Sequence, residues 1–436
     1  MSPRPEMSVV LVGMSWPGYR SLALGYVRAY AQADTRLAGR VGFATIESDA
    51  EADPWWIAYR VLEMKPDVVG FSVTCYNARA VFDAVSIIAS ARPGTRIVLG
   101  GPEMAGIAVE TLVANPGVTA VVRGEGEATF AELLHALLTD RPLWPVEGVS
   151  SRKADGTIIS APDRALITEM DTIPSPYLTG VTEAVDGSGY IETYRGCPHA
   201  CAYCYEGKGY GRLRTFSRER VQAEVAHFAG TPTVRSMSFI DPVFNLTPER
   251  LAWLAELMAP HAARGLRLHT IEVDIERIDS AAAALLVKAG VATVETGPQT
   301  IGDVALSACR RGFDRERFVA GVHACREAGI SVECDLIVGL PGDTENDFLG
   351  GLEFVLSCDP GKIQFSTLHV LPGTELWERA DELGLKYNRT APHEIISTPD
   401  MGFGALRRAE VFGSAVTRAY SARPIPATAP GTGGGL

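Results

Sequence analysis

Short apolar runs alternate with segments of helical periodicity along most of the chain, and this alternation constrains the fold more than any other feature. In the first third of the chain, five runs have the length and the β-branched content of buried strands. The predicted strands cover residues 8–12, 41–46, 67–72, 96–101 and 118–123, and the predicted helices cover 21–36, 56–64 and 80–91. This pattern predicts an α/β fold, with a doubly wound, Rossmann-like parallel sheet over residues 1–145.

The alternation resumes after a turn-rich segment, residues 146–185, which is predicted to be a linker. Six further strands are expected at residues 190–194, 236–240, 266–273, 293–296, 331–338 and 362–366, with helices between them. Together they predict a partial (β/α)6 TIM barrel over residues 186–375, whose site lies at the carboxyl ends of the strands. A helix at 376–385 is expected to open a C-terminal region, 376–420, in which we expect residues 386–420 to form a small lid near the site. A disordered tail, 421–436, follows it.

Charge and composition indicate which classes of partner are not expected. The chain has 436 residues and a formal net charge of −12, with no long basic run, so nucleic acid is not expected as a partner. No apolar stretch reaches the length of a membrane span and no signal-peptide pattern begins the chain, so no membrane partner and a cytoplasmic location are expected. Five of the eight cysteines are scattered singly, which fits a reducing compartment without disulfides.

The other three cysteines, Cys197, Cys201 and Cys204, form a CxxxCxxC motif directly after the first predicted barrel strand. Iron–sulfur clusters are held by cysteine thiolates, usually four of them. Three thiolates on one loop can hold three irons of a [4Fe–4S] cluster and leave the fourth iron open to a substrate or cofactor. The alternatives are a zinc site, for which His199 lies too close to two cysteines to complete a good tetrahedron, and buried free thiols.

Turns rich in glycine and hydroxyl residues follow the strands of the first domain, at the edge where ligands of doubly wound sheets bind. The first of these turns does not match GxGxxG, so a dinucleotide site is weakly supported. The candidate binding residues in these turns are Ser15, Ser72, Thr74, Gly100, Gly101, Glu103, Gly124 and Glu125.

The motif with its preceding Arg195-Gly196 and the aromatic Tyr203 resembles the radical S-adenosylmethionine (SAM) superfamily. The resemblance implies that the open iron binds the amino and carboxylate groups of SAM. It also implies that an electron from the cluster cleaves the sulfonium to give a 5′-deoxyadenosyl radical, with Tyr203 packed near the adenine. The turns of the first domain resemble the cobalamin-binding domain that precedes many radical SAM domains. The matching pieces lie at residues 21–26, 66–72, 100–103 and 123–127.

One departure from many cobalamin-binding proteins concerns the ligand below the cobalt. The DxHxxG histidine is missing, because the first histidine of the chain is His135. The resemblance places the loop 73–77 on that face, with Tyr76 as a bulky residue that does not ligate the metal. We therefore expect Tyr76 to favour a low-coordinate cobalt that takes up and releases a methyl group. The alternative is an aromatic residue of the domain interface in a domain without a corrin.

Polar residues at the carboxyl ends of the barrel strands are candidates for binding SAM, because its ammonium group and ribose need hydrogen-bond acceptors. The family resemblance supports several of these candidates, although each residue could instead be a cap or a buried pair. Arg310 and Arg311 are expected to be a solvated or interface pair. The candidates are Asp241, Glu272, Glu295, Gln299 and Asp335.

These observations predict a radical SAM enzyme whose cofactors are a [4Fe–4S] cluster, SAM and cobalamin. The expected reaction is methyl transfer to an unactivated carbon of a small-molecule secondary metabolite, with electrons from an external flavodoxin or ferredoxin. One alternative is a radical SAM enzyme that cyclises, rearranges or oxidises its substrate. Another is a non-catalytic electron-transfer protein. A tRNA-methylthiolating enzyme is disfavoured, because the chain has neither the three N-terminal cysteines nor the basic C-terminal module of that class.

Overall fold

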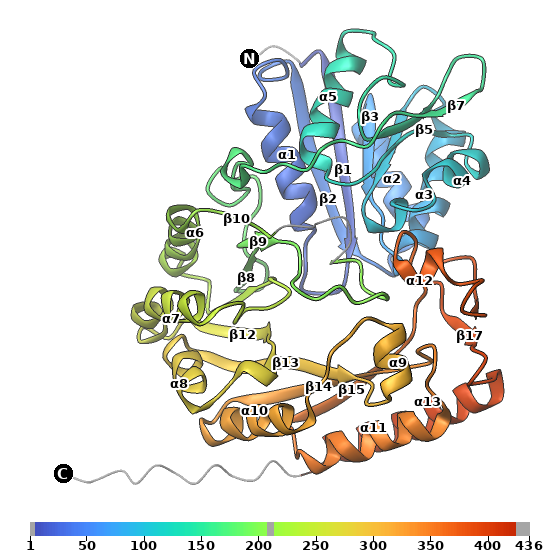
Figure 1. Ribbon diagram of the computed structural model, residues 1–436. Helices are drawn as coiled ribbons and strands as arrows, with labels where there is room; N and C mark the ends of the chain where they lie inside the picture. Colours follow the sequence, from blue (N-terminus) through green and yellow to red (C-terminus); the bar gives the residue numbers. More distant parts are fainter. Residues whose placement is uncertain (1–4, 207–212, 424–436) are drawn as a thin grey trace.

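The computed structural model describes residues 5–206 and 213–423 and shows two domains, one stacked above the other (Figure 1). The first domain is built on a seven-stranded sheet of order β2-β1-β3-β4-β5-β6-β7. Its strands are β1 Met7–Ser15, β2 Val41–Asp49, β3 Val68–Ser72, β4 Arg96–Gly100, β5 Val118–Val122, β6 Val149–Arg152 and β7 Ile158–Ser160. Strands β1 to β5 are parallel, which confirms the doubly wound sheet.

Helices cover both faces of this sheet and give it two separate hydrophobic cores. One core packs α1 and α5 on the sheet, and the other packs α2, α3 and α4. Each face of a parallel sheet must be covered in this way, since its strands are apolar on both sides. The helices are α1 Leu22–Ala33, α2 Pro54–Met64, α3 Ala78–Ala91, α4 Ala108–Ala114 and α5 Gly126–Leu138.

The second domain contains a six-stranded parallel sheet of order β15-β14-β13-β12-β11-β8. Its strands are β8 Ser188–Ile191, β11 Ser236–Phe239, β12 Arg267–Glu272, β13 Val291–Gln299, β14 Ser331–Val338 and β15 Lys362–Thr367. The six strands follow one another across the sheet in the order in which they occur in the chain, and a helix lies in every connection between them. The predicted partial barrel is therefore confirmed. The helices between the strands are α6 Arg218–Gly230, α7 Pro248–Ala262, α8 Ser280–Lys288, α9 Asp303–Ala308, α10 Arg315–Glu327 and α11 Glu345–Ser357.

Local signals in the sequence set the starts of these helices. The side chain of Ser217 accepts a hydrogen bond from the backbone N–H of Arg220 at the start of α6, as expected of an N-cap. Thr344 and Asp347 form a capping box at the start of α11, which satisfies two backbone N–H groups reciprocally.

Two segments differ from the sequence-based expectation. Strands β6 and β7 pair antiparallel and extend the first sheet, so residues 149–160 belong to that sheet although they were expected in the linker. The helix expected at 376–385 is the single turn α12 Glu375–Glu378. The helix ends at Glu378, and the following residues form turns up to Gly384, whose φ of 63° lies in the left-handed region.

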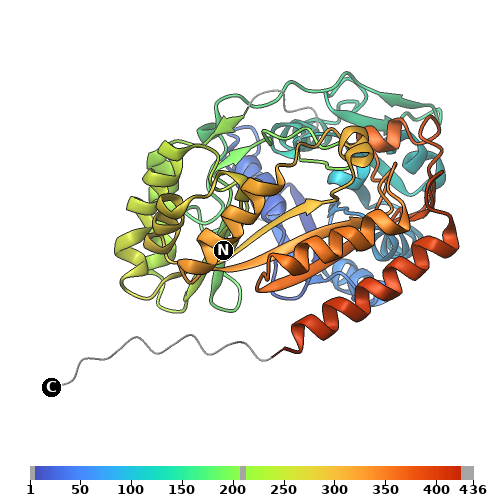
Figure 2. The same cartoon turned by 60° about the horizontal axis from the view of Figure 1, so that its bottom comes forward.

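The C-terminal region contains a short hairpin, β16 Lys386–Tyr387 with β17 Ile395–Ser397, followed by α13 Phe403–Ser421. Helix α13 packs beside α11 and against β15 on the outside of the barrel sheet, as the view from below shows (Figure 2). The expected disordered tail falls, apart from residues 421–423, outside the described residues. Among the described residues no helix is both long and apolar enough to cross a membrane.

Candidate site at the interface of the two domains

The three cysteines of the motif lie on a loop, residues 196–206, that follows the first barrel strand. Strand β8 leads into the short strand β9, Tyr194–Arg195, which pairs antiparallel with β10, Arg214–Thr215, and holds the base of this loop. Within the loop a turn is closed by the backbone N–H of Cys204, which donates to the carbonyl of Cys201 at 3.1 Å. The cysteine loop therefore lies at the carboxyl end of its strand, where barrel sites are found.

The thiols of the loop are partly or fully withdrawn from water. Burial raises the pKa of Cys204 to about 11. Burial also raises the pKa of Cys197, and its neighbours Cys201, Glu206 and Glu272 act in the same direction. Since an iron-bound thiol is deprotonated outright, binding of iron would oppose the effect of burial at Cys197 and Cys204. His199 points elsewhere, with Nε2 3.6 Å from the Asp274 carboxylate.

The donor set fits a cluster better than a single ion. No group of three or more His, Cys, Asp or Glu side chains in residues 5–206 and 213–423 is arranged to hold one metal ion. In a [4Fe–4S] cluster each thiolate binds a different iron, so the three sulfurs do not converge on one point. Three free thiols on one loop, with His199 directed to Asp274 instead, match that requirement.

Arg311 is a site residue that the sequence did not reveal. We expected it to belong to a solvated or interface pair, but it is partly buried, with Nη1 3.5 Å from Sγ of Cys201 and 3.4 Å from the hydroxyl of Tyr203. Its neighbour Arg310 is exposed as expected and pairs with Glu375. The expectation failed because Arg311 lies 110 residues after Cys201 in the chain. Only the tertiary structure brings its guanidinium to the cysteine loop.

The carboxyl ends of the barrel strands bring several predicted acidic residues together. Glu272 and Glu295 are directly paired across β12 and β13, and Oε1 of Glu295 accepts from the Gln364 amide at 2.9 Å. Burial raises the pKa of Glu272 to about 7, with Glu295 adding to the effect. Burial and the nearby Glu295 also raise the pKa of Asp335 on β14. These carboxyl groups can accept hydrogen bonds from the hydroxyls or the ammonium of a ligand.

Two other predicted residues of the barrel have different surroundings. Gln299 ends β13 with a φ of 64°, next to a register shift in the pairing with β14. Asp241 is fully buried, and its carboxylate accepts from both the N–H and the hydroxyl of Thr193 and from Arg250 at 2.7 Å. The expectation that Asp241 contacts a cofactor is therefore not supported, because its oxygens are already engaged in holding the end of β8.

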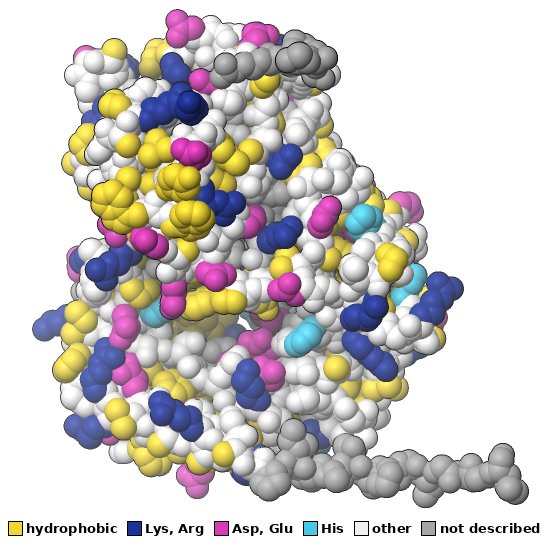
Figure 3. Space-filling model, turned by 180° about the vertical axis from the view of Figure 1, so that it is seen from behind, with side chains coloured by type: hydrophobic (Ala, Val, Ile, Leu, Met, Phe, Trp, Pro, Cys, Tyr) yellow, Lys and Arg dark blue, Asp and Glu magenta, His cyan; other side chains and the backbone are white. Residues whose placement is uncertain are grey.

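A cavity of about 310 Å³ lies between the two domains. Seen from behind, the molecule is hollowed between the domains, with acidic side chains around the hollow (Figure 3). The first domain contributes five of the predicted residues to the cavity lining: Ser72, Gly100, Gly101, Gly124 and Glu125. The cysteine loop contributes Gly196, Tyr205 and Glu206. One cavity is thus bounded both by the strand-end turns of the first sheet and by the loop that carries the cysteines.

The glycines keep this cavity open on the side of the first domain. A Cβ at Gly100 would have only Val122 near it, at 3.7 Å, and a Cβ at Gly124 would meet nothing within 4 Å. Apolar side chains such as Leu11, Val98 and Phe130 line another part of the cavity. An apolar cavity with a few polar groups is what a bulky organic cofactor requires, so the residues present fit cobalamin.

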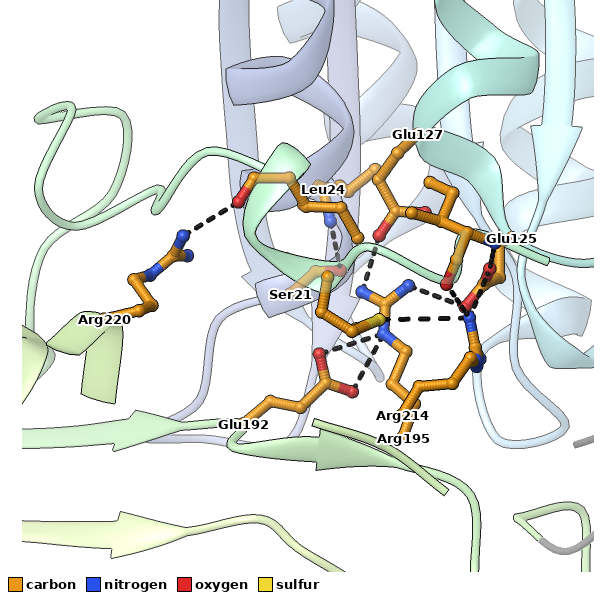
Figure 4. Close-up of polar contacts among 11 residues, drawn as sticks. Ser21, Leu24, Glu125, Glu127, Glu192, Arg195, Arg214 and Arg220 are labelled. Carbon is orange, nitrogen blue, oxygen red and sulfur yellow. Dashed lines mark hydrogen bonds and ion pairs between the residues drawn. The ribbon is translucent and has the colours of Figure 1, made fainter. Parts of the chain in front are cut away.

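A buried network of charges joins the two domains beside the cavity (Figure 4). Arg195, which directly precedes the cysteine loop, contacts Glu125 at 2.9 Å, Glu127 at 2.6 Å and Glu192 at 3.0 Å. Arg214 contacts Glu125 at 2.8 Å. Glu125 therefore forms an ion pair across the domain interface and also lines the cavity, and its expected binding role stays a prediction.

The carboxylates of this network differ in their protonation. Burial acts to raise the pKa of Glu125, but the guanidiniums of Arg214 and Arg195 outweigh it, and the net result is a lowered pKa. For Glu192 burial dominates over Arg195 and raises the pKa to about 7. The network is therefore closer to electrical balance at neutral pH than its two arginines and three glutamates would suggest.

Four predicted residues of the first domain lie away from the cavity lining. Ser15 is buried at the end of β1, and Thr74 follows β3. Tyr76 is 41% exposed, and its ring centroid lies 5.5 Å from that of Trp16. Glu103 is buried and contacts His393 of the C-terminal region, and its expected contact with a cofactor stays a prediction. That partner lies 290 residues away in the chain, which no local signal could indicate.

Comparison with known families agrees with this geometry. The B12-binding domain family matches residues 24–134, and the radical SAM superfamily matches residues 191–355. The first match covers most of the doubly wound domain, from α1 to α5 but without β1, and the second covers the barrel from the end of β8 to α11.

Two curated relatives are similar over most of the chain. An uncharacterised methyltransferase of Pyrococcus horikoshii is 29% identical over 331 residues, which cover 74% of this chain and 71% of the relative. The cobalamin-dependent radical SAM methyltransferase TokK of Streptomyces tokunonensis is 27% identical over 425 residues, which cover 90% of this chain. The matched part spans 60% of the length of TokK.

A solved structure shows the same arrangement of domains. TsrM of Kitasatospora setae, a radical SAM methyltransferase solved with tryptophan and a SAM analogue, aligns over 90% of this chain and 80% of its own, with a TM-score of 0.71 and 20% identity. The fold, the cysteine loop and the two domain matches lead to one conclusion: the chain belongs to the radical SAM superfamily and carries a B12-binding domain ahead of its radical SAM domain.

Proposed function

We propose that this protein is a cobalamin-dependent radical SAM methyltransferase that acts on an unactivated carbon of a small molecule. The observation that carries the proposal is the cavity of about 310 Å³ bounded by the strand-end turns of the B12-binding domain and by the cysteine loop. Two reactive centres on either side of one cavity can act on the same bound substrate, which is an advantage of proximity. The methyltransferase relatives support the choice of reaction.

Each part of the site has a role in this proposal. Cys197, Cys201 and Cys204 hold the cluster. The carboxyl groups of Glu272, Glu295 and Asp335, at the ends of adjacent strands, accept hydrogen bonds from SAM, with Gln299 and Tyr203 beside them. When bound, the cluster with SAM supplies hydrogen abstraction from carbon, and cobalamin supplies a transferable methyl group.

In the B12-binding domain, Ser72, Gly100, Gly101 and Gly124 form the wall that faces the corrin. Trp16 and Tyr76 form an exposed aromatic pair after β1 and β3, at the same edge of the sheet. The role of Tyr76 below the cobalt, and those of Ser15 and Thr74, stay predictions. The proposed partners are a small-molecule substrate and a one-electron donor of the flavodoxin or ferredoxin type, with neither nucleic acid nor a membrane.

The test is anaerobic reconstitution of the full chain with iron, sulfide and hydroxocobalamin. We expect four irons and four sulfides per chain, one corrin, and release of 5′-deoxyadenosine from SAM under reductant. With a substrate, S-adenosylhomocysteine should form and the product should gain the mass of one methyl group. A cluster without SAM cleavage would contradict an enzymatic function, and turnover without a gain of mass would indicate cyclisation or oxidation instead.

Matched variants separate the two cofactor sites. Cys201→Ala should lose the cluster, whereas Cys325→Ala, which removes a buried thiol in α10, should keep it. Gly100→Phe should fill the cavity and abolish corrin retention, whereas Gly94→Phe, in a turn where a Cβ meets nothing within 4 Å, should not. Retention of corrin by Gly100→Phe would place cobalamin elsewhere.

A further inference from the structure

Residues 309–311, which directly follow α9, contact the cysteine loop. The backbone N–H of Ala202 donates to the carbonyl of Cys309 at 2.9 Å, and two residues later the side chain of Arg311 reaches the same loop. Its Nη1 lies 3.5 Å from Sγ of Cys201 and 3.4 Å from the hydroxyl oxygen of Tyr203. The segment therefore contacts the loop through both its backbone and a charged side chain.

The guanidinium of Arg311 is held in place from its other side. Nη2 donates to the carbonyl of Gly297 at 2.5 Å, where β13 departs from regular pairing with β14. The Nε atom of Arg311 is buried and has no hydrogen-bond partner. A cation fixed between a barrel strand and a cysteine ligand, with little water around it, interacts more strongly with a nearby charge than a solvated one would.

Such a cation affects the electron affinity of a cluster. Reduction of an oxidised [4Fe–4S] cluster adds one electron, supplied here by the external donor, and makes the cluster more negative by one charge. Hydrogen bonds to the ligand sulfurs and nearby positive charge stabilise the reduced form, which raises the reduction potential. Both effects act at Cys201, because Arg311 provides a donor and a charge at the same sulfur.

We propose that Arg311 is a positioning residue that donates a hydrogen bond to the Cys201 thiolate and raises the reduction potential of the cluster. This inference rests on the proposed function, since it requires a cluster on the three cysteines. It identifies a residue outside the CxxxCxxC motif that determines how readily the cluster accepts its electron.

The test is a redox titration of the reconstituted full-length protein without SAM. The electron paramagnetic resonance signal of the reduced cluster is the readout at each potential. In Arg311→Met the ratio of reduced to oxidised cluster at a given potential should fall at least tenfold, which for one electron is a downward shift of about 59 mV. Arg310→Met is the matched control, because Arg310 is exposed and pairs with Glu375. It should titrate like the unaltered protein.

A second neutral variant, Arg311→Gln, carries the test if Arg311→Met does not assemble a cluster, and a downward shift is expected there too. A normal iron and sulfide content with an unchanged potential in either neutral variant would overturn the inference, as would an equal shift in Arg310→Met. If the unaltered protein assembles no [4Fe–4S] cluster, the proposed function itself fails. The two failures are therefore distinguishable.

Discussion

The carboxylate of Glu103 lies 2.7 Å from Nε2 of His393, and both side chains are only 2% exposed. Glu103 follows β4 in the B12-binding domain, whereas His393 belongs to the C-terminal hairpin region. On its other side the His393 ring packs edge-on against Trp377, with ring centroids 5.2 Å apart. The C-terminal region is thus attached directly to the turn beside the cavity glycines Gly100 and Gly101.

Removal of His393 should loosen this attachment. His393→Ala leaves the Glu103 carboxylate buried without its partner, which typically costs about 3–5 kcal/mol. We expect a lower denaturant midpoint and faster proteolysis of the C-terminal region. The control is Arg408→Ala, which removes a solvent-exposed pair with Glu345 and should change stability little. Equal effects of the two substitutions would contradict a structural role for the buried pair.

Arg195 should be more important for stability than an ordinary surface arginine. Arg195→Met leaves Glu125, Glu127 and Glu192 close together with one guanidinium fewer, and we expect a loss of about 3–5 kcal/mol in the free energy of unfolding. Chemical denaturation measures this loss in the free energy of unfolding. Arg36→Met, which removes an exposed partner of Asp34, is the control and should have a small effect. A comparable loss in both variants would show that the network does not stabilise the domain interface.

Glu47, at the end of β2, should make stability depend on pH. Burial raises its pKa to about 7, against the opposing effects of the Ser21 N–H and Arg20. Between its ordinary pKa of 4.5 and about 7 the folded state retains a proton that the unfolded state releases, so the contribution is present below pH 4.5 and is lost as pH rises toward 7. The difference in stability between Glu47→Gln and the unaltered protein should therefore depend on pH. Between pH 4 and pH 8 it should shift in favour of Glu47→Gln by up to about 3 kcal/mol.

Thermal unfolding from pH 4 to pH 8 measures this difference. Glu6→Gln serves as a control of opposite sign, because Arg40 lowers the pKa of Glu6 through a side-chain hydrogen bond, so the stability of Glu6→Gln relative to the unaltered protein should not rise between pH 4 and pH 8. A stability difference between Glu47→Gln and the unaltered protein that is the same at both pH values would show that the carboxyl titrates normally.

Gly297 should not tolerate a side chain. A Cβ at this position would lie 2.4 Å from the backbone oxygen of Asp335 and 2.7 Å from its Cβ, so β13 and β14 would have to separate. Gly297→Ala should cost about 1–3 kcal/mol and reduce cluster content, because the Gly297 carbonyl also holds Arg311. Gly312→Ala, where a Cβ meets nothing within 4 Å, should behave like the unaltered protein. Equal thermal midpoints for the two variants would contradict the argument.

Much of the architecture follows from local patterns. The alternation of apolar runs and helical periods predicts both parallel sheets, and the bounds expected for β14 agree with the structure. The antiparallel strands β6 and β7 are short and half-polar, so periodicity did not separate them from a linker. The helix expected at 376–385 was wrong beyond its first turn, because α12 ends at Glu378 and turns follow it.

The sequence by itself determined what depends on neighbours in the chain: the strand and helix order, the helix caps and the spacing of three thiols on one loop. The tertiary structure decided which polar side chains are free to bind and which are already paired. Glu103, Glu125 and Asp241 have the residue types of a binding site, yet each is engaged by an arginine or a histidine. The reason is physical: a buried charge needs a partner, and for Glu103 and Glu125 that partner comes from the other domain, tens to hundreds of residues away.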